Sequence, residues 1–344
     1  MARLALGLRA DWPTVDRARW MEGADRHGVL PLLARRARAE GVSWVVEGAE
    51  TTVGKARARQ AVLGLEAAHA FAILADQGIR AASFKGFATG RRFYPEEATR
   101  PLSDVDVLVA GADFDAAVRE LEQAGYRRRG DSERPTTVPT ADSWILVTPR
   151  GTFLDLHRAI ARPRVFPVDH DAILRRSVPG ALPGERWLDV ADELHLACLH
   201  HQKHSYRVLL VQILDAAILA TASPDWDRLC ADSRAFRTTR ALWVSLQWVR
   251  SIDRVRVPEE VLGALRPDAL RARDQGRNPS HGSRSRRVGL ALPSAAGAGL
   301  RAHHALDRPG ARRRKLAQPP CGGRGPIAIG CPREGSKCGS RSWL

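Results

Sequence analysis

Long apolar stretches are missing from this sequence. No apolar run approaches the roughly 20 residues that a helix needs to span a bilayer. Residues 1–10 contain arginines, but they lack an apolar core followed by a small-residue cleavage site, which is the pattern of a secretory signal peptide. We therefore expect a cytoplasmic protein with no membrane partner.

Cysteine is also scarce, and its spacing is uninformative. The count is odd, no two cysteines form a C-x-x-C pair, and three of them lie near the C-terminus. This pattern excludes the usual zinc-site spacings and argues against a disulfide framework. We expect reduced thiols with no shared role at Cys198, Cys230, Cys321, Cys331 and Cys338.

Positive charge is present in excess, but it is concentrated at one end of the chain. The formal net charge is +16, from 54 Lys and Arg against 38 Asp and Glu. Residues 271–344 hold 16 basic and 3 acidic residues, which leaves 38 basic and 35 acidic residues in 1–270. Nucleic-acid binding is therefore indicated only through the tail, whose run Arg312-Arg313-Arg314-Lys315 would act electrostatically.

The composition of the tail also differs from that of the preceding chain. Residues 271–344 are rich in Arg, Gly, Pro, Ser and Ala and show no hydrophobic periodicity. Such a segment cannot bury enough apolar surface to offset its chain entropy. We expect it to be disordered or to result from a frame disruption in GC-rich coding DNA. Re-reading the genomic frame around codon 271 would distinguish the two.

The rest of the chain has the pattern of an α+β protein. Hydrophobic periodicity predicts a small mixed β-sheet core, flanked by N-terminal helices and a C-terminal helical region. The predicted divisions are an N-terminal helical segment, a central core, a helical region and the tail, at residues 1–78, 79–162, 163–270 and 271–344. The predicted strands are 79–84, 105–109, 144–148 and 152–156. The predicted helices are 13–40 (as two), 55–77, 86–93, 113–124, 187–222, 225–249 and 259–270.

Two aspartates precede or lie within the second predicted strand. Alternate residues of a strand point to the same side, so Asp104 and Asp106 would project together, roughly 6–7 Å apart. Such a pair suits Mg²⁺, although a solvent-facing strand edge is the competing interpretation. The same D-x-D spacing recurs at three helix starts, where N-capping explains it. These are Asp113/Asp115, Asp169/Asp171 and Asp225/Asp227.

Asp155 is the candidate for a third carboxylate, although a strand-edge carboxylate is the plainer interpretation. It lies in the apolar segment 153–157, whose last residue, His157, would either orient it or lie at the surface. Three converging carboxylates would support two-metal nucleotidyl transfer. Asp104 and Asp106 would bridge both ions, and Asp155 would hold the ion that activates the nucleophile.

Lys85, Gly86 and Arg100 are the candidate phosphate-binding residues. Gly86 would open a helix whose free N–H groups and positive dipole end suit a phosphate, and the two cations would add countercharge. A solvated Lys85, and an Arg100 paired with Asp104 or Asp106, are the structural alternatives.

The histidines between residues 195 and 204 lack the glutamate of an H-E-x-x-H zinc site. We interpret them as a polar helix face that lines a substrate cleft. Asp215 is expected to pack against a basic neighbour.

Several short motifs occur together in the order of a known family. They are Lys85-Gly86, Tyr94-Pro95, Arg100-Pro101, Asp104/Asp106, Leu108-Val109 and Asp155-Leu156-His157. Over about residues 55–265 the chain resembles the uncharacterised nucleotidyltransferase family of the DNA polymerase beta-like nucleotidyltransferase superfamily. The resemblance implies a mixed sheet with flanking helices, Mg²⁺ and a nucleoside triphosphate donor.

One departure from the superfamily pattern bears on activity. Lys85-Gly86 stands where the superfamily usually has Gly-Ser or Gly-Gly facing the phosphates. We therefore weigh a metal-dependent transferase, which moves a nucleoside monophosphate to an acceptor and releases pyrophosphate, against a catalytically idle relative that binds nucleotide or a partner protein. A small molecule, a peptide, a protein side chain and an RNA end all stay open as acceptors, as does the oligomeric state.

Overall fold

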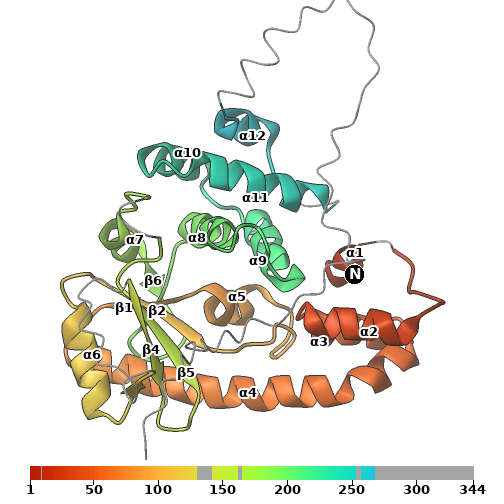
Figure 1. The fold of residues 1–344 in the computed structure, drawn as a ribbon, viewed down its shortest axis with the longest axis horizontal. Helices are drawn as coiled ribbons and strands as arrows, with labels where there is room; N and C mark the ends of the chain where they lie inside the picture. Colours follow the sequence, from red (N-terminus) through yellow and green to blue (C-terminus); the bar gives the residue numbers. More distant parts are fainter. Residues whose placement is uncertain (9, 130–141, 162–164, 253–256, 268–344) are drawn as a thin grey trace, which may run out of the picture. The chain divides into compact units, whose positions relative to one another are not determined.

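The computed structural model describes residues 1–8, 10–129, 142–161, 165–252 and 257–267 (Figure 1). The chain divides into two units, residues 1–281 and 282–344, and every described residue belongs to the first. The expectations for the tail, including its three cysteines and its basic run, lie outside the described residues. No helix in the described part of the chain is both long and apolar enough to cross a membrane.

Helices make up most of the described structure. The N-terminal helices are α1 (Ala2–Ala5), α2 (Arg17–Arg26), α3 (Leu30–Ala39) and α4 (Ser43–Asp76). Helices α5 (Lys85–Phe93), α6 (Phe114–Gln123) and α7 (His170–Arg176) lie between strands of the sheet along the chain. The last helices are α8 (Val190–Lys203), α9 (Leu210–Thr221), α10 (Trp226–Ala235), α11 (Thr239–Ser251) and α12 (Glu259–Leu265).

The strands form one mixed sheet, as the sequence predicted. They are β1 (Ala81–Phe84), β2 (Val105–Val109), β3 (Arg127–Arg128), β4 (Ser143–Val147), β5 (Phe153–His157), β6 (Val178–Pro179) and β7 (Glu185–Trp187). Their order is β3-β4-β5-β2-β1-β7-β6. Strand β2 pairs antiparallel with β1 and parallel with β5, which places it at the centre of the sheet.

The alternation of side chains along β2 gives the sheet two different faces. Val105, Val107 and Val109 are fully buried on one face and pack in a hydrophobic cluster with residues of α4 and α6. Leu108 points to the other face, where it clusters with residues of α7 and α8. Figure 1 shows α4 running beneath the sheet, with α5 and α8 on the opposite side. Asp106 therefore lies on the α5/α8 face.

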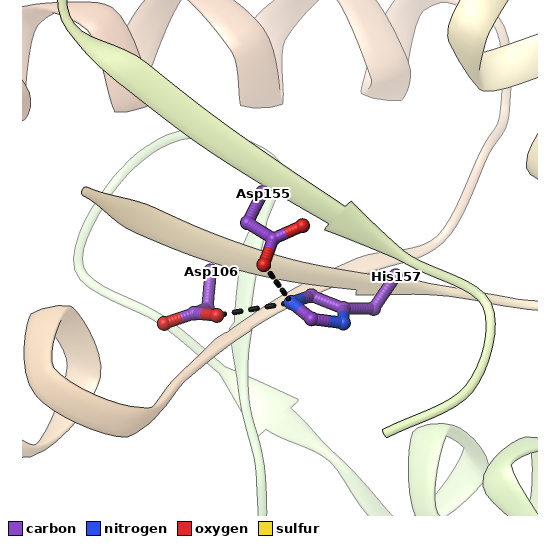
Figure 2. Close-up of side chains that lie close together, drawn as sticks. All are labelled: Asp106, Asp155 and His157. Atoms are coloured by element: carbon purple, nitrogen blue, oxygen red, sulfur yellow. Dashed lines mark hydrogen bonds and ion pairs between the residues drawn. The ribbon is translucent and has the colours of Figure 1, made fainter. Parts of the chain in front are cut away.

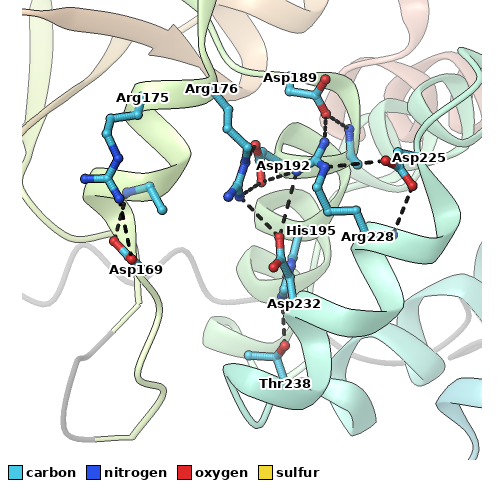
Figure 3. Close-up of polar contacts among 12 residues, drawn as sticks. Asp169, Arg175, Arg176, Asp189, Asp192, His195, Asp225, Arg228, Asp232 and Thr238 are labelled. Carbon is cyan, nitrogen blue, oxygen red and sulfur yellow. Dashed lines mark hydrogen bonds and ion pairs between the residues drawn. The ribbon is translucent and has the colours of Figure 1, made fainter.

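The C-terminal helices pack around their own apolar cluster, and ion pairs join them to α7. Arg176 of α7 donates to Asp192 of α8 at 2.6 Å and to Asp232 of α10 at 3.2 Å (Figure 3). Arg228 of α10 also pairs with Asp192, at 3.1 Å, and with Asp189. This network connects α7, α8 and α10.

Several element boundaries differ from the sequence predictions. The predicted helix 187–222 is two helices, because the chain turns between them with left-handed backbone at Ser205 (φ 52°) and Tyr206 (φ 59°). The predicted helix 225–249 is likewise divided, into α10 and α11. Strands β3, β6 and β7 were not predicted, because strands of two and three residues are too short for an alternating pattern.

Candidate active site

Two neighbouring strands bring Asp106 and Asp155 together. Strands β2 and β5 are parallel, and their register pairs Asp106 with Asp155 directly. Directly opposed residues project from the same face of a sheet, so both carboxylates lie on the α5/α8 face. His157 follows Asp155 by two residues and shares that face. This is an outcome of strand order, since β2 and β5 are separated along the chain by α6, β3 and β4.

His157 bridges the two carboxylates. Its Nε2 atom lies 2.9 Å from Asp106 Oδ1 and 3.0 Å from Asp155 Oδ2 (Figure 2). The imidazole is 2% exposed and packs edge-on against Phe84, with ring centroids 5.1 Å apart. Potential ligand atoms from these three residues lie within 4.8 Å of one another. The cluster of Asp106, Asp155 and His157 therefore has the geometry to hold a metal ion.

The hydrogen bonding of Asp155 also fits a metal ion. Its Oδ1 atom is buried and has no hydrogen-bond partner in the described structure. A buried carboxylate oxygen without a partner is costly, and cation binding relieves that cost. Two aspartates and an imidazole are common ligands for divalent cations. The types of ligand in the cluster and the unpartnered oxygen of Asp155 therefore both favour a bound cation.

Asp104 lies beside this cluster rather than within it. It precedes β2, is half-buried, and accepts a hydrogen bond from Ser103 Oγ at 2.9 Å. Burial raises the pKa of Asp104, and the negative charge of Asp106 raises it further. Among the described residues, the three potential ligands that lie close together are Asp106, Asp155 and His157. Asp104 is not one of them. His157 is buried against both strand aspartates, which excludes the surface position that was one of its two sequence interpretations.

Lys85 supplies the countercharge for Asp106. Its Nζ atom lies 2.5 Å from Asp106 Oδ1. Burial alone would raise the pKa of Asp106, but the Lys85 ammonium and the hydrogen bond with His157 outweigh it and hold this pKa below its usual range. Lys85 begins α5 with left-handed backbone (φ 55°), and its N–H donates to Glu193 Oε1 at 2.5 Å. The backbone of Lys85 is therefore held by Glu193, and its ammonium is ion-paired with Asp106.

Glu193 of α8 is a buried carboxylate that the sequence analysis did not identify. It is 2% exposed, and its Oε1 also accepts from Thr89 Oγ1 at 3.2 Å. Its Oε2 is buried and has no hydrogen-bond partner in the described structure. Burial raises the pKa of Glu193 to about 8. No local motif marks Glu193, because its partner Lys85 is 108 residues away in the sequence.

Arg100 pairs with Asp215, not with Asp104 or Asp106 as one sequence interpretation held. Its Nη2 lies 2.7 Å from Asp215 Oδ2, and Tyr94 donates its hydroxyl to Asp215 Oδ1 at 2.7 Å. The guanidinium packs over Gly86, where an added Cβ would lie 2.6–2.8 Å from it. The expectation that Asp215 packs against a basic residue is confirmed. Gly86 is needed because any larger residue would displace Arg100.

All six predicted site residues line one cavity of about 550 Å³. They are Lys85, Gly86, Arg100, Asp104, Asp106 and Asp155. The opposite wall comes from α8 and α9 and includes His200, Lys203 and His204. The interpretation of this part of α8 as a polar face at a cleft is confirmed for His200 and His204. Of the other two histidines in that interpretation, His201 is buried but also lines the cavity, whereas His195 is buried away from the cavity and bonds to Thr238 at 2.7 Å.

The tautomer of His200 follows from its neighbours. Gln212 uses its Oε1 to accept the N–H of Leu209 at 2.9 Å, which leaves its Nε2 to donate to His200 Nε2, also at 2.9 Å. His200 therefore carries its proton on Nδ1. Burial, followed by the charge of Lys85, lowers the pKa of His200 to about 3, so the ring is neutral at physiological pH. A neutral imidazole adds a hydrogen-bond donor to this wall without adding charge.

Comparisons with known proteins were made for the whole chain. A family model described as uncharacterised nucleotidyltransferase matches residues 13–252, which is more than half of the sequence. Among solved structures, the chain is similar to the solution structure of the antibiotic-resistance factor ANT(2'')-Ia, with 12% sequence identity and a TM-score of 0.37. That match covers 57% of this chain and 98% of the other. A comparison with curated protein sequences gives no match.

Proposed function

The chain belongs to the uncharacterised nucleotidyltransferase family, and from that premise we propose that it is a metal-dependent nucleotidyltransferase. In this proposal it moves a nucleoside monophosphate from a nucleoside triphosphate to an acceptor and releases pyrophosphate. The observation that carries the proposal is the pairing of Asp106 with Asp155 on adjacent strands, beside a cavity of about 550 Å³.

The charges of the cavity support a requirement for divalent cations. Its lining has more negative than positive side chains even with Glu193 protonated: Asp25, Asp104, Asp106, Asp155 and Asp215 against Arg26, Lys85, Arg100 and Lys203. A triphosphate is a polyanion, so the carboxylates would repel it unless positive charge were added. Mg²⁺ is the proposed source of that charge, because it prefers carboxylate ligands and phosphate oxygens.

Each residue has a proposed role in the reaction. Asp104, Asp106 and Asp155 would hold Mg²⁺ as a two-ion site, with His157 orienting the two strand aspartates. Bound divalent cations in such sites activate the attacking hydroxyl and neutralise the leaving pyrophosphate. The proposed nucleotide-binding residues are Lys85, Gly86 and Arg100. Of these, Lys85 has the more flexible side chain, whereas the planar guanidinium of Arg100 is held by hydrogen bonds from two of its nitrogens to Asp215.

The first experiment measures nucleotide binding without needing the acceptor. Each of the four nucleoside triphosphates would be titrated into the protein, first with Ca²⁺ present and then with no divalent cation. We expect metal-dependent binding that Asp106→Asn and Asp155→Asn abolish. Asp113→Asn is the matched control, because Asp113 has the same D-x-D spacing but is the N-cap residue of α6 and does not line the cavity. Cation-independent binding, or equal binding by all variants, would contradict the proposal.

The second experiment measures turnover. The protein would be incubated with the bound nucleotide, Mg²⁺ and fractionated cell metabolites, peptides or RNA, and pyrophosphate release would be followed. We expect one fraction to stimulate release by the wild type and not by Asp106→Asn. Stimulation that Asp106→Asn retains would exclude this site as its source.

One observation favours a second candidate, a catalytically idle relative that binds nucleotide or a protein. The groups expected to face the phosphates already have internal partners: Lys85 Nζ has Asp106, Lys85 N–H has Glu193, and Arg100 has Asp215. This candidate predicts metal-dependent nucleotide binding with no pyrophosphate release from any fraction.

A further inference from the structure

The ammonium group of Lys85 occupies the position of a cation within the acidic site. It lies 2.5 Å from Asp106 Oδ1, and its side chain is 18% exposed. Burial lowers the pKa of Lys85, but the charges of Asp106, Asp155 and Asp104 raise it more, so the amine stays protonated. The negative charges of all three proposed metal-binding aspartates therefore stabilise this one ammonium group.

The backbone of Lys85 is fixed, whereas its side chain has room to move. Strand β1 ends at Phe84, and the hydrogen bond from Lys85 N–H to Glu193 holds the left-handed start of α5. A lysine side chain has four flexible carbons, so Nζ can leave Asp106 without any change in that backbone. The cavity that Lys85 lines provides the space for this movement.

The carboxylates of the site need a positive charge beside them, which Lys85 supplies when no metal is bound. Asp106 and Asp155 are register partners on one face of the sheet, and two unscreened carboxylates there would repel each other. A divalent ion at the same carboxylates would repel an ammonium hydrogen-bonded to one of them. A nucleoside triphosphate entering the cavity would present phosphate oxygens that attract the released ammonium.

We propose that Lys85 is an exchangeable internal cation. It neutralises Asp106 in the metal-free protein, is displaced when a divalent ion binds the aspartates, and then pairs with a phosphate of the incoming triphosphate. The inference rests on the proposed function, because it assigns Lys85 a role in the order of metal and nucleotide binding. It makes metal and triphosphate binding mutually reinforcing, since each one favours the released lysine.

Metal affinity without nucleotide tests the first step. Mn²⁺ binding would be measured by electron paramagnetic resonance for wild type, Lys85→Met, Lys85→Arg and Lys203→Met. We expect Lys85→Met to bind Mn²⁺ at least about tenfold more tightly, because no cation must be displaced; this corresponds to about 1.4 kcal/mol. Lys85→Arg keeps the charge and should bind no more tightly than wild type.

Lys203→Met is the control for a general change in charge. Lys203 lines the same cavity from α8, is exposed, and forms no ion pair with Asp106 in the described part of the chain. Its removal should change Mn²⁺ affinity by less than about twofold. Equal tightening by Lys203→Met and Lys85→Met would overturn the proposal, as would unchanged affinity in Lys85→Met.

Nuclear magnetic resonance of the lysine ammonium groups tests the displacement directly. The chain has only five lysines, so the ¹⁵N-labelled Lys85 signal can be assigned by its loss in Lys85→Met. We expect a hydrogen-bonded signal without metal that shifts when Mg²⁺ is added and shifts again with tripolyphosphate. A Lys85 signal that Mg²⁺ leaves unchanged, although Mg²⁺ binds, would overturn the proposal.

The two proposals fail in different ways. If Asp106→Asn and Asp155→Asn leave Mn²⁺ binding unchanged, the metal site and the proposed function fail together. If those variants abolish Mn²⁺ binding but Lys85→Met binds like the wild type, only the exchange fails. A third measurement is the effect of tripolyphosphate on Mn²⁺ affinity, which should be clearly smaller in Lys85→Met than in the wild type.

Discussion

The ion pair between Arg100 and Asp215 should be essential for stability, and Asp215→Asn tests it. The side chains are 13% and 9% exposed, respectively, and their charged atoms lie 2.7 Å apart. Asp215 also accepts the hydroxyl of Tyr94 at 2.7 Å. The substitution leaves the guanidinium buried against Gly86 without its countercharge.

The expected loss can be estimated from the burial of the pair. Removing one partner of a buried ion pair costs about 3–5 kcal/mol, because the other charge stays uncompensated. Asparagine keeps one acceptor oxygen, and both side chains retain some solvent contact, so we expect the lower end, about 3 kcal/mol. For a protein of this size, each kcal/mol lowers Tm by about 2–4 °C, which gives a decrease of about 6–12 °C.

Urea unfolding followed by far-ultraviolet circular dichroism provides the measurement. The double variant Arg100→Met/Asp215→Leu should recover part of the loss, since an apolar pair of similar volume leaves no buried charge. Glu22→Gln, which removes the carboxylate of an exposed pair with Arg26, should leave the midpoint unchanged. A midpoint for Asp215→Asn equal to the wild type, or a double variant as unstable as the sum of both single variants, would refute the reasoning.

Three further predictions concern packing and pH. Gly86→Ala should destabilise the protein by about 1–3 kcal/mol, because its Cβ would meet the fixed guanidinium of Arg100. Gly54→Ala, in open space on α4, should stabilise the protein by about 0.5–1 kcal/mol. Urea unfolding measures both changes. The raised pKa of Glu193, about 8 in the folded state, means that stability falls as pH rises from about 4.5 to 8. Between pH 5 and 9, the free energy of unfolding of Glu193→Gln should rise relative to that of the wild type. A constant difference between the two free energies over this range would contradict the prediction. Leu108→Ala should cost about 2–5 kcal/mol and the exposed Leu65→Ala almost nothing, and equal midpoints would contradict the assigned burial.

Local patterns were sufficient to predict much of the core. The apolar run 105–109 predicts β2, the predicted strands 144–148 and 152–156 correspond to β4 and β5, and the α+β class follows from the order of helices and strands. These predictions succeed because residue spacing within a segment controls which face that segment buries. The motif residues from Lys85 to Asp155 could also be collected from the sequence, and all of them line one cavity.

Contacts between distant segments were decided only by the tertiary structure. The strand order places β2 beside β5, and this alone brings His157 between Asp106 and Asp155. The partners of Lys85 and Arg100 on α8 and α9, Glu193 and Asp215, lie more than 100 residues away along the chain. The sequence by itself determined which chemical groups were available and which local structures carried them. The packing of α8 and α9 over the sheet decided their partners and protonation, because burial and nearby charge depend on three-dimensional distance rather than sequence separation.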